Sequence, residues 1–487
     1  MKHPLQYISL QSGKLVAGCL LILMAASGCK KYLEVPLPID RIAVASAFDN
    51  DYTAVGALNS IYAALYVGGN FDGNQSVNFY SGLYTDEFKN YSQGVAYQAV
   101  YMNGVSSTLG GLTALWSSLY KQLYSVNLAI EGLTPDNKGL TYRNQWLGEA
   151  YFLRGLLYFY LTNAYGDVPL VLGSDYLNNN SLARSPQTDV YKQILSDLLQ
   201  AQTLLTPEFR DGSGLVTKDR GRPNQAAAAA LLARVYLYLS DWKNAATQSG
   251  ILIGNTATYQ LVNPAQTFLV NSTENIWGLV PTQNTVFNYK VKDVGAYTVP
   301  KGKTPLIAGI VATLSDSIVN SFEPNDLRFT NWVGTDTVPP SGPTIMAVYY
   351  YANKYKANGT YTAAQETLVL LRLAEMYLIR AEARAQQSDL SGALADLNAV
   401  RTRAGLPGST AVSQTEILNA IQKERRVELF TEGHRFFDLR RTKALDALMT
   451  KLSPLKGGSW DAYKQWWPIP VSDVQSNKSL LQTPGYQ

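Results

Sequence analysis

Apolar side chains recur at helical spacing along much of this chain. Between Ser46 and Val67 the apolar positions are Val55, Leu58, Ile61, Tyr62 and Leu65. Steps of three and four residues place them on one face of an α-helix. Ser46 is a candidate N-cap, because its hydroxyl could accept a hydrogen bond from a free amide of the first turn. The pattern therefore predicts an amphipathic helix over 46–67.

A longer helical region starts near Trp116. Trp116, Tyr120 and Leu123 continue the helical spacing, which extends to Leu161. Gly166 and Pro169 are typical signals for the end of a helix.

Two later segments each predict a helix, a short turn and a second helix. They cover residues 226–245 and 371–406, with alanines where helices would pack closely and an aspartate near the turn. This layout is similar to tetratricopeptide helical pairs. The spacing between the segments is irregular, which indicates a divergent set. Helical scaffolds of this kind usually bind partners through one face.

Two stretches lack this regularity, and one of them is a candidate binding surface. Residues 68–107 are rich in Gly, Asn, Ser and Tyr, and residues 255–365 predict short strands and turns. The candidate ligand residues of the first stretch are Tyr91, Tyr97, Tyr101 and Asn103. Aromatic faces stack on a pyranose ring, and amides bridge neighbouring hydroxyls. The alternative at each tyrosine is a packing role over the core.

The densest charge pattern lies between Glu424 and Arg441. Glu424, Glu428 and Glu432 are four residues apart, among five arginines, with Gly433 positioned to weaken or end the helix. Carboxylates beside arginines could form an acid/base or anion site. The alternative, which we favour, is a partly buried ion-pair network that clasps the fold, because structural motifs and functional sites need not coincide.

The amino-acid composition argues against some classes of function. Residues 1–28 hold two lysines and no acid, so 39 of the 41 basic residues and all 37 acidic residues remain beyond them. That balance argues against a nucleic-acid binder, which would show a basic patch. Only one histidine (His434) and one cysteine (Cys29) lie beyond residue 28. A zinc site would have to rely on carboxylates, so we expect no metal.

The first 28 residues resemble a bacterial lipoprotein signal peptide. The apolar run Leu15–Ala26 is too short to span a bilayer. It leads to Ala26-Ser27-Gly28-Cys29, which is similar to a lipobox, although leucine is usual in place of Ala26. Acylation of Cys29 would anchor the chain to a membrane. The alternatives are an ordinary secretory signal that leaves Cys29 as a free thiol, and a lipobox at Cys19 with little apolar sequence before it.

Motifs of common enzyme classes are missing from the sequence. It contains no G-x-x-x-x-G-K-[ST], G-x-G-x-x-G or G-x-S-x-G. A triad would have to use His434. Glycoside hydrolysis needs only two carboxylates, so it stays open in principle. The one acid pair near the tyrosines is Asp86-Glu87, whose side chains would point apart in an extended strand. We expect no catalytic residues and no cofactor.

Four segments resemble a known family. They are GEAYFLRGLLYFYL with YGDVPL, RLAEMYLIRAEA, ERRVELFTEGHRFFDLRR, and a terminus reading WPIP and QTPGY with Thr483 where asparagine is usual. All are similar to segments of the SusD/RagB family of Bacteroidetes surface lipoproteins. The resemblance implies a mainly α fold of tetratricopeptide-like pairs with a loop-rich insert.

The resemblance also implies a function. It suggests a cell-surface, outer-membrane lipoprotein that captures an oligosaccharide for a SusC-like TonB-dependent transporter. Some relatives take peptides or glycoprotein fragments, and a helical scaffold without ligand is a further alternative. In this family the insert joins the N-terminal loops in the ligand face, which adds Tyr289 and Trp332 as candidates. Trp277 has apolar neighbours and reads as core, whereas Asn331 and Gly334 beside Trp332 predict an exposed platform.

The expected division of the chain has four parts. They are a signal peptide at 1–28, a tether at 29–45, an N-terminal helical region at 46–270 and a C-terminal region at 271–487.

Overall fold

The structure is a computed structural model that describes residues 46–135, 139–283, 288–338 and 347–486. The chain separates into two units, 1–47 and 48–487, and the following concerns the second. The predicted signal peptide and the whole of the predicted tether, which includes Cys29, lie outside the described residues.

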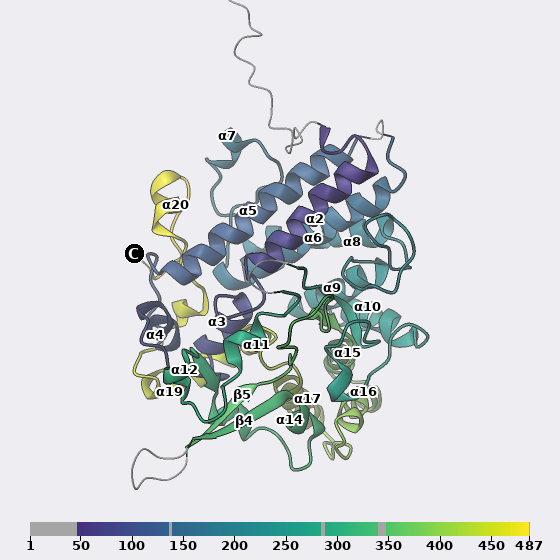
Figure 1. Ribbon diagram of the computed structural model, residues 1–487. Helices are drawn as coiled ribbons and strands as arrows, with labels where there is room; N and C mark the ends of the chain where they lie inside the picture. Colours follow the sequence, from purple (N-terminus) through teal and green to yellow (C-terminus); the bar gives the residue numbers. More distant parts are fainter. Residues whose placement is uncertain (1–45, 136–138, 284–287, 339–346, 487) are drawn as a thin grey trace, which may run out of the picture. The chain divides into compact units, whose positions relative to one another are not determined.

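Four helices form the N-terminal part. They are α2 (Asp51–Val67), α5 (Gly110–Leu133), α6 (Arg143–Tyr165) and α8 (Gln187–Leu204). Each packs against the next in chain order (Figure 1). The predicted N-cap of the first helix is wrong. The cap is Asn50, whose extended backbone lets its side-chain oxygen accept from Thr53 N at 3.0 Å.

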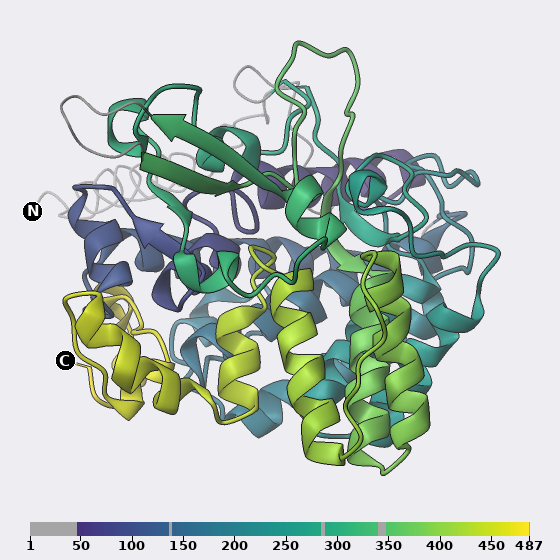
Figure 2. The same cartoon turned by 90° about the horizontal axis from the view of Figure 1, so that it is seen from below.

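Two helical pairs continue the succession. They are α9 (Gln225–Tyr238) with α10 (Trp242–Gly254), and α15 (Leu373–Gln386) with α16 (Leu390–Arg403). Both turns use the same chemistry. A serine adopts positive φ (Ser240, +57°; Ser388, +66°), and the aspartate after it caps the second helix. The mainly helical fold with paired helices is therefore confirmed. Figure 2 shows α15, α16 and α17 (Gln414–Glu428) side by side.

The core of these pairs consists of small and aliphatic side chains. Ala374, Leu378 and Ala381 of α15 pack with Ala393 and Leu397 of α16, and all five are fully buried. Alanine at the interface lets the two helices approach closely, which explains the alanine-rich pattern of the sequence.

The insert predicted over 255–365 contains short strands, as expected. β2 (Asn275–Leu279) pairs with β6 (Leu368–Arg372), and β4 (Val333–Val338) pairs with β5 (Ala347–Ala352), both antiparallel. β1 (Phe88–Asn90) pairs with β3 (Ala312–Leu314). The short helical segments here are η3 (Pro264–Gln266), α11 (Asp293–Tyr297), α12 (Pro305–Ala308), α13 (Asp316–Val319) and α14 (Leu327–Trp332). Trp277 is buried, which confirms its core role.

The stretch 68–107 is more regular than the sequence predicted. It contains α3 (Val77–Tyr84) and α4 (Val95–Tyr101) around β1. All eight residues of α3 are buried, so the helix has no polar face and gives no periodic signal. Ser76 caps it by accepting from Phe79 N at 3.1 Å.

The C-terminal segments pack onto the N-terminal helices. They are α18 (Arg435–Arg441), α19 (Leu445–Leu455), η4 (Ala462–Gln465) and α20 (Val471–Ser476), and the loop after α6 carries α7 (Tyr176–Asn179). Trp467 is buried and stacks on Phe436 with a 7° interplanar angle, so it has a packing role. Within the described ranges, none of the helices combines the length and apolar composition that crossing a bilayer requires.

Candidate functional site

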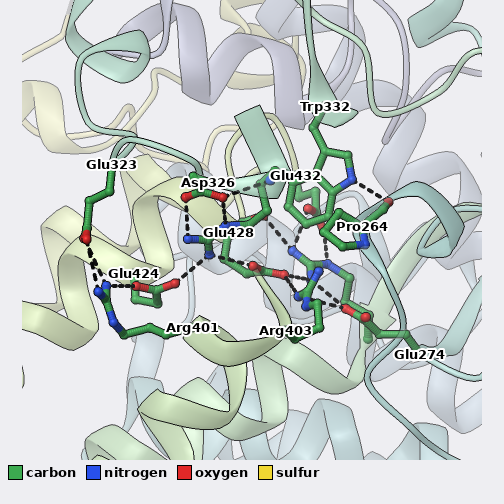
Figure 3. Close-up of polar contacts among 12 residues, drawn as sticks. Pro264, Glu274, Glu323, Asp326, Trp332, Arg401, Arg403, Glu424, Glu428 and Glu432 are labelled. Atoms are coloured by element: carbon green, nitrogen blue, oxygen red, sulfur yellow. Dashed lines mark hydrogen bonds and ion pairs between the residues drawn. The ribbon is translucent and has the colours of Figure 1, made fainter. Parts of the chain in front are cut away.

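The three glutamates spaced four apart form the centre of a buried ion-pair network. Figure 3 shows Glu428 beside Arg403, and arginines of three elements pair with it. Arg328 of α14 lies 2.8 Å from Glu428, Arg372 at the end of β6 lies 2.5 Å away, and Arg403 of α16 also pairs with it. Burial alone would raise the pKa of Glu428, but the three guanidinium groups outweigh it and hold that pKa far below its ordinary value.

The two neighbouring glutamates extend this network. Glu432 pairs with Arg372 at 2.7 Å and with Lys354 at 2.5 Å, and Glu424 pairs with Arg328 at 2.6 Å. Burial lowers the pKa of Lys354 to about 8, against the opposing pull of Glu432. The carboxylates are saturated by cations from the insert and the helical pairs, so the arrangement clasps these parts together, as the sequence predicted. We call these three glutamates and their arginine and lysine partners, together with Trp332, the clasp.

Trp332 belongs to the clasp and is not an exposed platform. Its side chain is 1% exposed, and its Nε1 donates to Pro264 O at 2.8 Å (Figure 3). Lys354 Nζ lies 4.8 Å from its ring centroid. The last residue of α14 turns inward to cover the cations, whereas sequence neighbours suggested an outward direction. The prediction for Trp332 is therefore wrong.

Two of the other candidate residues lie on a partly exposed aromatic face. Tyr91 follows β1 and meets Tyr349 of β5 edge to face, with ring centroids 5.8 Å apart. Tyr101 ends α4, with Lys456 Nζ 4.6 Å from its ring. Burial raises the pKa of Tyr101, with smaller influences from Lys89, which lowers it, and from Tyr91, which raises it, so these side chains lie near one another. We call Tyr91, Tyr101 and Tyr349 the aromatic face.

Tyr97 and Asn103 have different environments. Tyr97 is half-buried against Phe79, with centroids 6.0 Å apart and perpendicular rings. Burial raises its pKa, and a hydrogen bond with Gln75 acts in the opposite direction. Asn103 is fully buried, and its Nδ2 donates to Tyr84 O at 2.8 Å. A side chain enclosed in this way cannot contact a ligand at the surface, so the prediction for Asn103 is wrong.

A cavity of about 530 Å³ adjoins Tyr97 through Gln75. Its walls come from residues 67–75 and 290–296, with one residue of the loop before β6. The polar side chains that line it are Asp72, Asn74, Gln75, Lys290, Lys292 and Asn358. Tyr289, directly before Lys290, has a left-handed backbone with φ of +65°. The amides and charged groups offer both donors and acceptors to a polar ligand. We call this space the first cavity.

The floor of the first cavity is a reciprocal pair of contacts between distant segments. Lys292 N donates to Asp72 Oδ2 at 3.0 Å, and Gly73 N donates to Asp293 Oδ1 at 2.6 Å. Burial raises the pKa of Asp72 to about 6, and burial together with Asp72 raises that of Asp293 well above its usual range. Burial and the nearby Asp72 carboxylate therefore favour the protonated form of Asp293. These contacts fix the floor, and the amide side chains of Asn74, Gln75 and Asn358 also line the cavity.

Asp86 and Glu87 do not point onto the aromatic face. Asp86 lies 2.6 Å from Arg426 and 2.9 Å from Arg435, and Glu87 is buried beside Thr431 N. Burial, with Asp86 adding to it, raises the pKa of Glu87 to about 7. Among the residues that the structure describes, no group of three or more His, Cys, Asp or Glu could hold a metal ion.

The sequence did not indicate Tyr349, Gln75, Lys292 or Asn358 as site residues. Tyr349 belongs to the run Ala347–Ala352, which reads AVYYYA, so a strand with an exposed tyrosine could have been expected. Gly334 opposite Tyr351 supports the hairpin, because a Cβ there would lie 2.2 Å from the Tyr351 ring. The lining of the first cavity has no comparable signal, since it depends on segments about 220 residues apart.

Comparison with known proteins gives a consistent result. Residues 330–486 match a family model described as "SusD family", and residues 39–237 match one described as "Starch-binding associating with outer membrane". SusD-like protein P2 of Formosa agariphila is 27% identical over 421 residues, which are 77% of this chain and 81% of that protein.

Solved structures agree in fold. A SusD superfamily protein from Bacteroides vulgatus is 23% identical with a TM-score of 0.75, covering 90% of this chain and 99% of that one. A structure named laminarin binding SusD-like protein has the same identity and TM-score, covering 90% of this chain and all of that one.

Proposed function

The chain belongs to the SusD/RagB family, and from that premise we propose that it binds a neutral oligosaccharide at the aromatic face and the first cavity. The observation that carries this proposal is the position of Tyr91, Tyr101 and Tyr349 on one surface, with a cavity of amide and charged side chains linked to them through Tyr97 and Gln75.

The chemistry of the surface suits a sugar. The partly exposed tyrosine rings offer apolar faces to the C–H groups of pyranose rings. Asn74, Gln75 and Asn358 can donate to one hydroxyl and accept from the next. Lys292 Nζ donates to the carbonyl groups of Tyr66 and Val67, and Lys290 Nζ donates to Asn358 O, so both ammonium groups already have protein partners and the site does not need a charged ligand. A starch-binding family description and a laminarin-binding neighbour point to glucans as the first class to test.

The proposed setting is the cell surface. Cys29, in its lipobox-like context, would carry the lipid that anchors the chain to the outer membrane. A SusC-like TonB-dependent transporter would receive the ligand that this chain captures. The family description that includes association with the outer membrane supports this placement.

We propose binding without catalysis. Asp86 is saturated by Arg426 and Arg435, and Glu87 is buried away from the aromatic face. Asp72 and Asp293 accept from backbone amides in the floor of the first cavity. His434, the one histidine beyond residue 28, is buried, and burial holds its pKa well below the usual value.

Titration calorimetry of the chain from residue 30 onward tests the proposal. The probes are laminarihexaose and maltohexaose, with a tryptic digest of casein as the peptide control. We expect one glucan to bind, and Tyr91→Ala or Tyr349→Ala to weaken it about tenfold, because each removes about 1.4 kcal/mol of ring contact. Tyr52→Ala is the matched control, since Tyr52 is 88% exposed on α2 and lines no part of the site.

The alternatives give different outcomes. Binding of peptides alone would keep an import function and exclude the glycan. Release of reducing sugar during the titration would identify a glycosidase. A glucan affinity that neither tyrosine substitution lowers would overturn the assignment of the site.

A further inference from the structure

A second cavity of about 470 Å³ lies between α5, α7 and α20. Figure 1 shows α7 and α20 beside the long helix α5. None of its lining residues belongs to the first cavity or to the aromatic face. Its volume is within the range of small-molecule binding sites.

One wall of this cavity is aromatic. Trp116, Tyr120 and Tyr124 are four residues apart on α5 and therefore share one face of the helix. Trp116 is buried at the base, with its ring 4.7 Å from that of Tyr120, whereas Tyr124 is 46% exposed. Tyr176 of α7 is 65% exposed and also lines the cavity. The rings thus extend from a fixed base to an open rim.

The base of the aromatic wall is held in place by polar contacts. Trp116 Nε1 donates to Asp473 Oδ2 at 2.8 Å, and Tyr120 OH donates to Pro169 O at 2.9 Å. Asn477 Nδ2 donates to Leu182 O at 2.8 Å, which ties the end of α20 to the loop after α7. These contacts hold the base without any ligand, and preorganisation of this kind lowers the cost of binding.

Two amide side chains retain hydrogen-bonding capacity toward the cavity. Asn179 Nδ2 donates to Gly173 O at 2.9 Å, which leaves its side-chain oxygen without a donor in the described part of the chain. The Asn180 side chain makes no hydrogen bond to any described residue. An amide that both donates and accepts can bridge adjacent hydroxyls of a sugar.

We propose that this cavity is a second carbohydrate site, which binds a neutral sugar ring against Tyr124 and Tyr176. A purely apolar ligand would leave the amides unpaired, and an anion would meet the carboxyl group of Asp473 at the base. The site stands on its own contacts and does not depend on the aromatic face. Two separate sugar sites would let one chain hold a long glycan at two points, which raises the overall affinity.

Saturation-transfer difference NMR tests this proposal in a background that combines Tyr91→Ala with Tyr349→Ala, which removes both rings of the edge-to-face pair from the aromatic face. The probes, at high millimolar concentration, are the methyl glycosides of glucose, galactose and mannose. We expect transfer to at least one of them, falling to background when Tyr124→Ala and Tyr176→Ala are added. Tyr124→Phe should retain the transfer, because it keeps the ring, and Tyr52→Ala should leave it unchanged.

Two results would overturn the second site. One is the absence of transfer to all three probes in the protein that carries Tyr91→Ala and Tyr349→Ala. The other is transfer that persists when both rim tyrosines are removed, in a protein whose unfolding midpoint is unchanged. Neither result bears on the aromatic face, whose own test is the loss of glucan binding in Tyr91→Ala alone.

Discussion

The clasp and the aromatic face are both built from aromatic and polar side chains, yet their organisation is opposite. In the clasp, Glu428 meets three arginines, and Trp332 covers the cations with 1% of its own surface exposed. On the aromatic face, Tyr91 and Tyr349 meet edge to face and stay partly exposed beside a cavity. A dense, saturated network leaves no group for a ligand, whereas a sparse set of exposed rings does. Charge density therefore marks the element that holds this fold together, and partly exposed rings mark the surface at which we propose binding.

The strongest test of this contrast is Glu428→Gln. It removes the carboxylate from three buried guanidinium groups, so the free energy of unfolding should fall by about 3–5 kcal/mol. Urea unfolding measures the change. Glu208→Gln is the control, because Glu208 is exposed and forms no ion pair with a described residue. A loss below about 1 kcal/mol would contradict the structural importance of the clasp.

Glu87→Gln should change how the free energy of unfolding depends on pH. Glu87 lies between β1 and the clasp. Its pKa in the folded state is about 7, against 4.5 in its ordinary state. The unfolded chain therefore loses this proton at lower pH than the folded chain, so wild-type stability falls as the pH rises from 4.5 to 7. Relative to Glu87→Gln, the wild type should lose about 3 kcal/mol across that window. A difference in the free energy of unfolding between the two proteins that is the same at all pH values would refute this prediction.

Trp332→Phe separates the two regions directly. The change removes the hydrogen bond to Pro264 and leaves a small void, so the free energy of unfolding should fall by about 2 kcal/mol. Glucan affinity should stay the same, because the ring never contacts ligand. Unchanged stability with altered affinity would restore Trp332 as an exposed platform.

Tyr91→Ala should give the complementary result, with the smallest effect on stability. Its edge contact with Tyr349 is partly exposed, so the free energy of unfolding should change by about 0.5 kcal/mol or less. Glucan affinity should fall about tenfold. The calorimetric and urea measurements on one preparation give both numbers, and a large loss of stability would assign Tyr91 to packing.

The sequence correctly predicted the structural features that depend on a local pattern of residues. The one-sided helices, the two helical pairs and the clasp all follow from spacings of three, four or seven residues, and the described structure contains them. It failed for α3, because a helix buried on every side has no polar face. It failed for Trp332 and Asn103 because side-chain direction depends on distant partners, Pro264 and Tyr84 respectively. The boundary expected at residue 270 stays a prediction.

The reciprocal contacts under the first cavity have a consequence for how the chain acquires its activity. Lys292 with Asp72 and Asp293 with Gly73 close loops of about 220 residues, whereas the two helices of each pair are joined by a short turn. Loop closure of that length costs more entropy, and contacts between distant segments form slowly. The helical pairs can therefore assemble early, and the ligand cavity appears only when both halves of the chain have met. Under the proposed function, sugar binding would then report complete folding, because a fragment that ends before residue 290 has no cavity floor.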